Sequence, residues 1–412
     1  MNCLCYTSPA YGGYGLMNLG MQIPESFIMF AGPPSCGRHS AIGSFQKDNK
    51  HRNSYLFLSD EDISLGTVEE EIYSAVDSIL SDIKKRPRVF IILFACALFI
   101  EGIDERAVIS YLSEKYSDIT FQVCLMNPIS IGTDHAPVTM MYSRMAELYD
   151  KSQQENSLNF LGNNIPVDHG SEIYDVLSKL GVRKVNHASE LKDFDSFRTM
   201  GHARWNLVIK PEGIRAAKEL SPRMDYRVLL TSYEFEEIES QYEQIFDMLG
   251  GRVDLSDYKR KAEESIKNTS ERLKGKTIAL GSSASYKVFG LARMMVKNGF
   301  DITDIFSSRD IYPDVPPFDK EAYDWIVENT DIRLHNTADP KMLGKIRSVC
   351  KADVAIGFNA AYFTDTDCIV EAVNDEGMFG YYGINLMMKR IDDALDDPKD
   401  LKRLVERYGL VI

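Results

Sequence analysis

The chain has 412 residues, of which 44% are hydrophobic and 26% charged, a composition typical of a soluble globular protein. This length exceeds what one compact core usually contains, so two or three domains are expected. The net charge of −14 argues against a nucleic acid or an anionic membrane as a partner, because both require a basic surface that displaces counterions.

Nothing near the start of the sequence resembles a secretory signal, since a charged segment followed by an apolar one is missing. The most apolar run, residues 89–100, is too short to cross a bilayer. We interpret it as a parallel strand buried on both faces. The sequence therefore predicts a cytoplasmic protein with no membrane partner.

In the first third, strand-like runs alternate with helix-like runs. An apolar strand begins at Ile28, and further strands are predicted at residues 54–60, 88–95 and 119–127. Amphipathic helices are predicted at residues 67–85 and 104–116. The polar stretch 150–156 is a candidate domain boundary.

The alternation continues to the end of the chain. A charged helical stretch at 234–274, interrupted at Gly250 and Gly251, is a candidate connector between domains. The pattern predicts an α/β fold of three Rossmann-like domains with mainly parallel sheets, covering residues 1–155, 156–272 and 273–412. Further strands are predicted at 157–163, 205–211, 225–232, 300–308, 331–337 and 352–358, and further helices at 170–181, 339–350, 384–395 and 398–409.

The segment "IMFAGPPSCGRHSAIGSF" permits several interpretations. Gly32 and Gly37 have the spacing of a phosphate loop, but the two prolines between them lack the N–H groups that bind phosphate. Arg38 and His39 stand where such a loop has Lys and Ser or Thr, so the chain itself is not expected to hydrolyse ATP. A thiolate–imidazole pair of Cys36 and His39 is a second alternative.

A metal site is the third interpretation. The seven cysteines are odd in number, which disfavours a disulfide framework. Cys5 lies in a Gly-rich loop, Cys36 follows a strand, and Cys96 lies late in the buried strand. Strand ends of a parallel sheet meet at one edge, where three thiolates could hold an iron–sulfur cluster. Each cysteine could instead be a small buried hydrophobic residue.

Three segments in this order, "CYTSPAYGGYG", "FAGPPSCGRHS" and "FACALFIEGIDE", resemble the cysteine-containing segments of the nitrogenase component 1-like family. That family includes nitrogenase catalytic subunits, cofactor-scaffold subunits and dark-operative protochlorophyllide reductase subunits. Downstream patterns such as "KTIALGSSASYKVFGLARMMVKNGF" extend the resemblance over nearly the whole chain. The resemblance implies an iron–sulfur cluster, 4Fe-4S or P-cluster-like, on Cys5, Cys36 and Cys96, with Cys3 as the alternative to Cys5. It also implies supporting contacts to the cluster from Gly32, Arg38 and His39.

The same resemblance implies an oxidoreductase. Electrons would arrive from a separate ATP-dependent iron protein and pass at low potential to a substrate or second cofactor. A like subunit would complete the assembly as a homodimer, a paralogous heterodimer or a heterotetramer. Two other functions stay open, a non-catalytic scaffold for metal-cluster assembly and a cluster-free small-molecule binding protein.

The sequence departs from nitrogenase catalytic subunits at their two ligands for the large metal cofactor. These positions align near Ile209-Lys210 and Phe379, where no ligand side chain is present. A molybdenum–iron cofactor and dinitrogen reduction are therefore not expected, and no catalytic residue is identified. Cys350 and Cys368 are interpreted as buried structural residues. His135 could line a pocket and His169 is expected at a helix start, but an ordinary structural role is favoured for both histidines.

Overall fold

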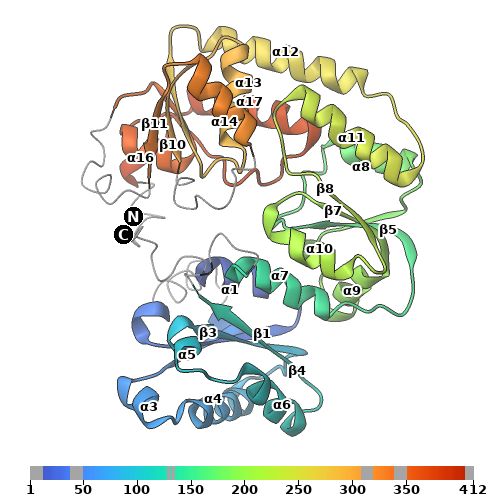
Figure 1. The fold of residues 1–412 in the computed structure, drawn as a ribbon, viewed down its shortest axis with the longest axis vertical. Coiled ribbons are helices and arrows are strands. Elements are labelled where there is room, and N and C mark those ends of the chain that lie inside the picture. Colours follow the sequence, from blue (N-terminus) through green and yellow to red (C-terminus); the bar gives the residue numbers. More distant parts are fainter. Residues whose placement is uncertain are drawn as a thin grey trace.

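The computed structural model describes residues 13–37, 50–127, 130, 135–307, 319–337 and 350–403. Three separate sheets have the strand orders β2-β1-β3-β4, β6-β5-β7-β8 and β11-β10-β9-β12-β13. Neighbouring strands run parallel in all three sheets, as in the pairs β1–β3, β5–β7 and β9–β10, and helices connect them (Figure 1). The predicted α/β class with parallel sheets is confirmed.

The first sheet holds the two cysteines that the structure describes in the predicted site. All residues of the central strands β1 and β3 are buried, which explains why both read as continuous apolar runs. The strands of this sheet are β1 Ser26–Gly32, β2 Asn53–Phe57, β3 Val89–Ala95 and β4 Thr120–Met126. Its helices are α1 Gly13–Met21, α3 Asp60–Leu65, α4 Val68–Asp82, α5 Cys96–Ile100, α6 Glu105–Lys115 and α7 Pro137–Glu147.

The apolar run 89–100 is not one strand. Strand β3 ends at Ala95, and Cys96 is the first residue of helix α5 instead of lying late in the strand as predicted. The reason is the loss of pairing partners, because the neighbour β1 ends at Gly32 and the pairing with β4 ends opposite Met126. Hydrophobicity alone does not distinguish a buried strand from the short helix that follows it.

Buried side-chain amides fix the strand register of the second sheet. Asn159 lies opposite Asn186 on one neighbouring strand and Asn206 on the other, and its side chain hydrogen-bonds both at 2.9 Å. Because every amide here is buried, a shift in register would leave polar groups unpaired. The strands are β5 Glu155–Leu161, β6 Lys184–Asn186, β7 Ala203–Val208 and β8 Asp225–Val228. The helices are α8 Glu172–Lys179, α9 Phe194–Arg198, α10 Ile214–Leu220 and α11 Phe235–Leu249.

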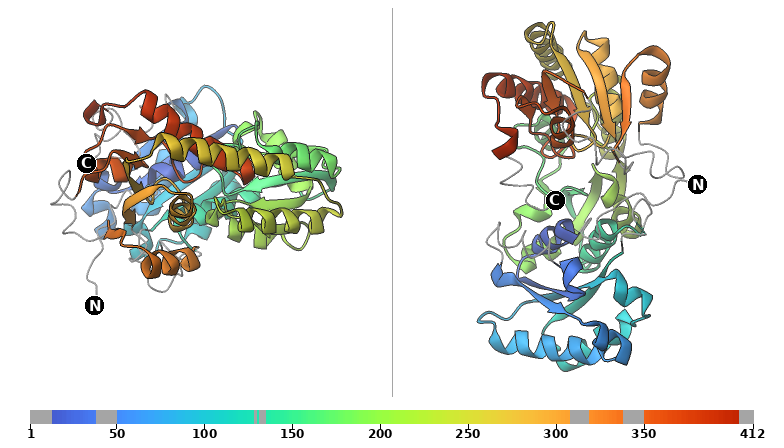
Figure 2. Two further views of the ribbon diagram at one scale, coloured as in Figure 1. Left: turned by 90° about the horizontal axis from the view of Figure 1, so that it is seen from above. Right: turned by 90° about the vertical axis from the view of Figure 1, so that its left-hand side faces the viewer.

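The predicted connector consists of α11 and α12 (Ser256–Arg272), separated by Gly250, whose φ of 77° ends the first helix. Helix α12 then lies beside the long helix α17, with Arg272 paired to Asp392 and Asp396 (Figure 2). The strands of the third sheet are β9 Thr277–Gly281, β10 Asp301–Ser307, β11 Arg333–Asn336, β12 Val354–Ile356 and β13 Ile369–Val370. The other helices are α13 Val288–Lys297, α14 Lys320–Asn329, α16 Phe358–Thr364 and α17 Gly380–Asp396.

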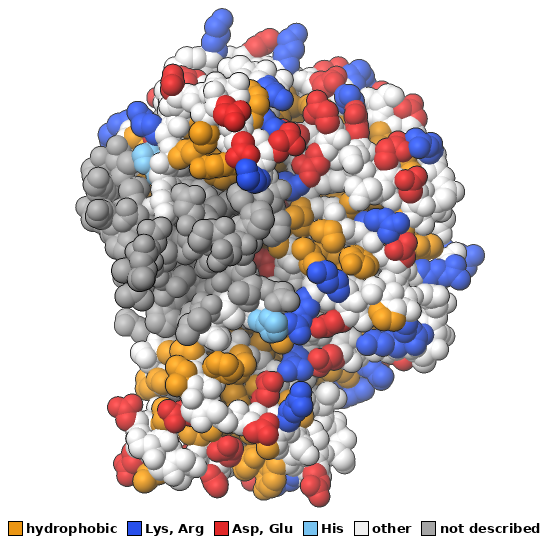
Figure 3. Space-filling model, in the orientation of Figure 1, with side chains coloured by type: hydrophobic (Ala, Val, Ile, Leu, Met, Phe, Trp, Pro, Cys, Tyr) orange, Lys and Arg blue, Asp and Glu red, His pale blue; other side chains and the backbone are white. Residues whose placement is uncertain are grey.

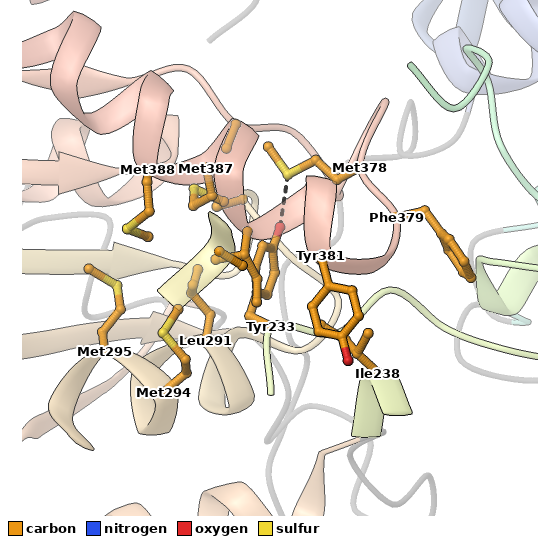
Figure 4. Close-up of a cluster of buried hydrophobic side chains, with 14 of the residues drawn as sticks. Tyr233, Ile238, Leu291, Met294, Met295, Met378, Phe379, Tyr381, Met387 and Met388 are labelled. Atoms are coloured by element: carbon orange, nitrogen blue, oxygen red, sulfur yellow. Dashed lines mark hydrogen bonds between the residues drawn. The ribbon is translucent and has the colours of Figure 1, made fainter. Parts of the chain in front are cut away.

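The three sheets share hydrophobic cores. One core joins side chains of β1 and β3 to α7 and α10, and another joins the second sheet to α13 and α17. In the second core, the Tyr233 hydroxyl donates to Asp375 at 2.8 Å and lies 3.0 Å from the Met378 sulfur, among methionines of α13 and α17 (Figure 4). None of the helices in the described part of the chain is long and apolar enough to cross a membrane.

Candidate functional site

The carboxyl ends of β1 and β3 lie against each other at Gly32 and Ala95. A Cβ atom at Gly32 would lie 2.3 Å from the Cβ atom of Ala95, which is closer than two carbon atoms can approach. Only glycine therefore allows the two strand ends to meet. The segments that carry Cys36 and Cys96 leave the sheet from these two ends.

Cys36 lies in a short helical turn at residues 34–37, directly after β1. Its backbone N–H donates to the Pro33 carbonyl at 3.1 Å, and the next residue, Gly37, packs against the rings of Phe30 and Phe57. These contacts hold the Cys36 thiol half-buried at the edge of the sheet.

Cys96 begins α5 directly after β3, the strand that pairs with β1. Burial raises the pKa of Cys36, the Ser35 hydroxyl lowers it, and Cys96 raises it further by electrostatic repulsion. The two cysteines thus follow adjacent strand ends, although 60 residues separate them in the sequence. Cys96 is half-buried as well. A pair of partly buried thiols from adjacent strand ends fits the donor set of an iron–sulfur cluster.

The other residues predicted for this site, Cys5, Arg38 and His39, lie outside the described residues, as does the alternative ligand Cys3. Their place at the site stays a prediction. Gly32 is at the site, where its contact with Ala95 accounts for its identity.

Exposed apolar side chains accompany the two cysteines. Phe57, which lies opposite Gly32 in the sheet, is 47% exposed. On α5, Phe99 is 54% exposed and Ile100 is 71% exposed. Apolar side chains are conspicuous on the lower part of the molecule in Figure 3. We call Phe57, on the edge strand β2, and Phe99 and Ile100, on α5, the apolar rim.

A second group of chemically active residues lies where the second and third sheets meet. Lys210, after β7, is only 2% exposed, and its Nζ lies 3.8 Å from an oxygen of Glu376. Glu212 accepts a hydrogen bond from the hydroxyl of Tyr286, and Asp375 accepts one from the Tyr286 backbone N–H at 3.0 Å. We call these five residues the acidic junction.

The acidic junction contains more carboxyl groups than buried cations. Burial raises the pKa of both Glu212 and Asp375. One oxygen of Glu212, Oε2, is buried without a hydrogen-bond partner among the described residues. Such an atom is usually satisfied by a bound molecule, by water or by its own proton.

Sequence reasoning missed the acidic junction. Glu212 and Asp375 follow strands β7 and β13, and the rule that ligands gather at carboxyl strand ends is the signal that would have found them. Near the aligned cofactor-ligand positions, the chain presents the Lys210 amine and the ring of Phe379, which packs edge-on against Phe160. Neither side chain is a metal ligand under ordinary conditions.

The remaining candidates are placed as follows. His135 lines a cavity of about 280 Å³ with Cys124 and Arg144. His169 lies just before α8 and contacts Glu190 at 2.6 Å. Cys350 and Cys368 are half-buried instead of fully buried, and they are considered further below.

Comparisons with known proteins indicate one protein family. A family model described as nitrogenase component 1 type oxidoreductase matches residues 14–396. The nitrogenase iron-molybdenum cofactor biosynthesis protein NifE of Clostridium pasteurianum is 24% identical over 298 residues, which cover 68% of this chain and 64% of that protein. The light-independent protochlorophyllide reductase subunit N of Chlorobaculum tepidum is 22% identical over 296 residues, which cover 70% of this chain and 68% of that protein.

Two solved structures share the fold. Nitrogenase Cp1 at pH 6.5 superposes with a TM-score of 0.68 at 15% identity, covering 93% of this chain and 91% of that one. Nitrogenase Cp1 at pH 5 gives a TM-score of 0.55 at 16% identity, covering 94% and 88%. The chain aligns with about two thirds of the length of the two curated relatives.

Proposed function

Because the chain belongs to the nitrogenase component 1 type oxidoreductase family, we propose that it is a reductase subunit that carries an iron–sulfur cluster. The cluster, 4Fe-4S or P-cluster-like, would supply low-potential electrons to a substrate or second cofactor. The observation that supports this proposal most directly is that Cys36 and Cys96 follow the carboxyl ends of the paired strands β1 and β3, at one edge of the first sheet.

In this proposal the residues at the carboxyl ends of β1 and β3 have separate roles. Cys36 and Cys96 are two of the cluster ligands, and Cys5 is the predicted third. Gly32 allows the two strand ends to meet, so that the two thiols face the same centre. The half-buried position of both thiols limits the access of water, which helps to keep a low-potential centre from losing electrons to solvent.

The apolar rim supports a proposal for the partners. Phe57, Phe99 and Ile100 are the exposed apolar groups beside the two cysteines. We place a like subunit, either a second copy or a paralogue, on this surface, where it would supply the remaining contacts to the cluster. A separate ATP-dependent iron protein is the proposed electron donor.

Reduction consumes protons as well as electrons, and the acidic junction offers a donor. Burial favours the protonated form of Glu212, and its unpaired oxygen Oε2 is where we place that proton. Asp375 and Glu376 would hold the Lys210 amine nearby, which can orient an anionic group of the reducible molecule. Tyr286 keeps Glu212 in position through its hydroxyl.

Anaerobic purification of the full chain, followed by iron and sulfide analysis and electron paramagnetic resonance, tests the proposal. We expect bound iron and sulfide with a signal that appears on reduction. Cys36→Ala and Cys96→Ala should each lose most of the iron. Cys368→Ala is the matched control, because its thiol is equally half-buried but donates to the Ala394 carbonyl in another part of the fold. Unchanged iron content in both site variants would refute the proposed cluster.

The similarity to NifE supports a second candidate, a scaffold on which a metal cluster is assembled. Lys210 and Phe379, at the two aligned positions, are not metal ligands themselves, which is compatible with a cluster that is only transiently held. A scaffold should transfer its iron to an acceptor protein, whereas a reductase should keep its iron during turnover. Iron labelled with ⁵⁷Fe and followed by Mössbauer spectroscopy distinguishes the two outcomes.

A further inference from the structure

The third sheet contains a group of metal-binding side chains that the proposed cluster does not use. Asp304 lies in β10, His335 lies in the neighbouring strand β11, and Cys350 precedes β12. One ligand atom from each of the three lies within 4.8 Å of the others. This is the one such group among the residues that the structure describes, and it belongs to a different sheet from Cys36 and Cys96.

The three side chains already interact. The His335 Nε2 atom lies 2.7 Å from Asp304 Oδ1, and the Cys350 Sγ atom lies within 4.8 Å of a ligand atom of each. The Asp304 side chain is completely buried, and the His335 ring is fixed by stacking on Phe306 at 4.6 Å. The ligands are therefore held in place before any ion arrives, which reduces the entropy that binding would cost.

The buried carboxylate requires a cation. Arg333 supplies one, with Nε 2.8 Å from Oδ1 and Nη2 2.7 Å from Oδ2 of Asp304. The Arg333 side chain is 59% exposed, whereas that of His335 is 15% exposed. Arg333 can thus withdraw toward solvent, which opens a path by which an ion could reach the three ligands.

We propose that Asp304, His335 and Cys350 form a divalent metal site of the zinc class, in which Arg333 holds the place of the ion when the site is empty. Thiolate, imidazole and carboxylate together are a donor set that selects Zn²⁺ over Mg²⁺ or Ca²⁺. Bonds of about 2.0 to 2.3 Å would place tetrahedral ligand atoms roughly 3.5 Å apart, so modest side-chain shifts complete the site. The fourth position is open to water or to an outside ligand.

The test uses Co²⁺ as a spectroscopic probe and Zn²⁺ as the competitor on the full chain, stripped of metal and kept anaerobic. We expect one equivalent of Co²⁺ to produce a thiolate-to-cobalt absorption band that Zn²⁺ abolishes. Cys350→Ser should remove the band, and His335→Gln should weaken Zn²⁺ binding at least about tenfold. Arg333→Gln should bind Zn²⁺ several-fold more tightly, because it removes the competing cation.

Matched controls separate this site from the cluster and from misfolding. Cys368→Ser, also in the third sheet, and Cys36→Ala should both retain the cobalt band. The iron content of Cys350→Ser should equal that of the unmodified chain, so the cluster proposal can fail while this one stands. A band that survives in Cys350→Ser, or Zn²⁺ binding that weakens in Arg333→Gln while its melting temperature is unchanged, would show that these residues form an ion-pair network only.

Discussion

The carboxylate of Glu172, in α8, accepts a hydrogen bond from the backbone N–H of Tyr381 at 2.6 Å, in the first turn of α17. The hydroxyl of Tyr242 donates to this same oxygen, Oε1, at 2.7 Å, and the other oxygen, Oε2, accepts from the N–H of Tyr382 at 3.0 Å. A buried carboxylate thus satisfies the amino end of α17. These bonds fix how the second and third sheets sit relative to each other.

Glu172→Gln should weaken this attachment. The amide nitrogen of glutamine cannot accept a hydrogen bond. Depending on how the amide is oriented, the buried hydrogen bond from the N–H of Tyr382 or the bonds from Tyr381 and Tyr242 are lost. We expect a loss of ~1 to 3 kcal/mol in the free energy of unfolding, measured by urea denaturation. Glu243→Gln, which removes an exposed ion pair with Arg252, is the control and should cost less than about 1 kcal/mol. Equal costs would mean that Glu172 is not an essential cap.

Gly32→Ala should disturb the edge of the first sheet where Cys36 and Cys96 lie, without changing either cysteine. The added methyl group would overlap Ala95, so the ends of β1 and β3 must separate. We expect a cost of ~1 to 3 kcal/mol in stability and a clear loss of bound iron. Gly383→Ala in α17 adds the same methyl group where the nearest atom is 3.4 Å away, and it should leave iron unchanged. Full iron content in Gly32→Ala would argue against a cluster shared by the two strand ends.

Phe99→Glu should prevent association with a like subunit. A charge at the centre of an apolar contact cannot be solvated in the complex, and exposed aromatic residues often contribute most of the binding energy. Light scattering after size-exclusion chromatography should show a shift toward the single chain, with a dissociation constant raised at least about tenfold. Val327→Glu, at an exposed apolar position of α14, should not change the mass. If both variants associate normally, the apolar rim is not the interface.

His187 should make the fold sensitive to mild acid. Its Nδ1 atom lies 3.0 Å from the Asn163 amide nitrogen, and its Nε2 atom lies 2.8 Å from the Tyr174 hydroxyl. The Asn163 amide nitrogen also donates to the Ile165 carbonyl, so Nδ1 must accept a hydrogen bond and the ring must be neutral. Burial, with a smaller effect of His169, lowers the pKa of His187 to about 3.

In the unfolded chain His187 binds a proton near pH 6.5, but in the folded chain it does not. The contribution of its neutral ring to the free energy of unfolding is therefore fully present above pH 6.5 and falls as the pH decreases toward 3. Each pH unit within this window should cost ~1.4 kcal/mol. Urea midpoints at pH 7.5 and 5.5 should therefore differ less in His187→Gln than in the unmodified chain. His51→Gln, at an exposed position, should keep the original difference. A His187→Gln variant with an unchanged pH dependence would contradict a neutral buried ring.

The order of strands and helices could be predicted because local patterns carry it. The continuous apolar runs at β1 and β3 and the amphipathic pattern of α4 depend only on neighbouring residues and on the side that is buried. The strand predicted at residues 88–95 ends where β3 ends, but the placing of Cys96 late in the strand was wrong, because Ala95 is followed by residues that are equally apolar. What ends the strand there is the absence of further pairing, which depends on distant segments.

By itself, the sequence determined the alternation of strands and helices, the parallel class of the sheets and the choice of Cys36 and Cys96 as candidate ligands. Only the tertiary structure decided that these two cysteines follow adjacent strand ends, that Glu212 and Asp375 meet Lys210, and that Asp304, His335 and Cys350 converge. Hydrophobic periodicity involves residues that are close in the sequence, so it can be recognised from the sequence alone. These groups of side chains depend instead on how strand ends that are far apart in the sequence are brought to the same place.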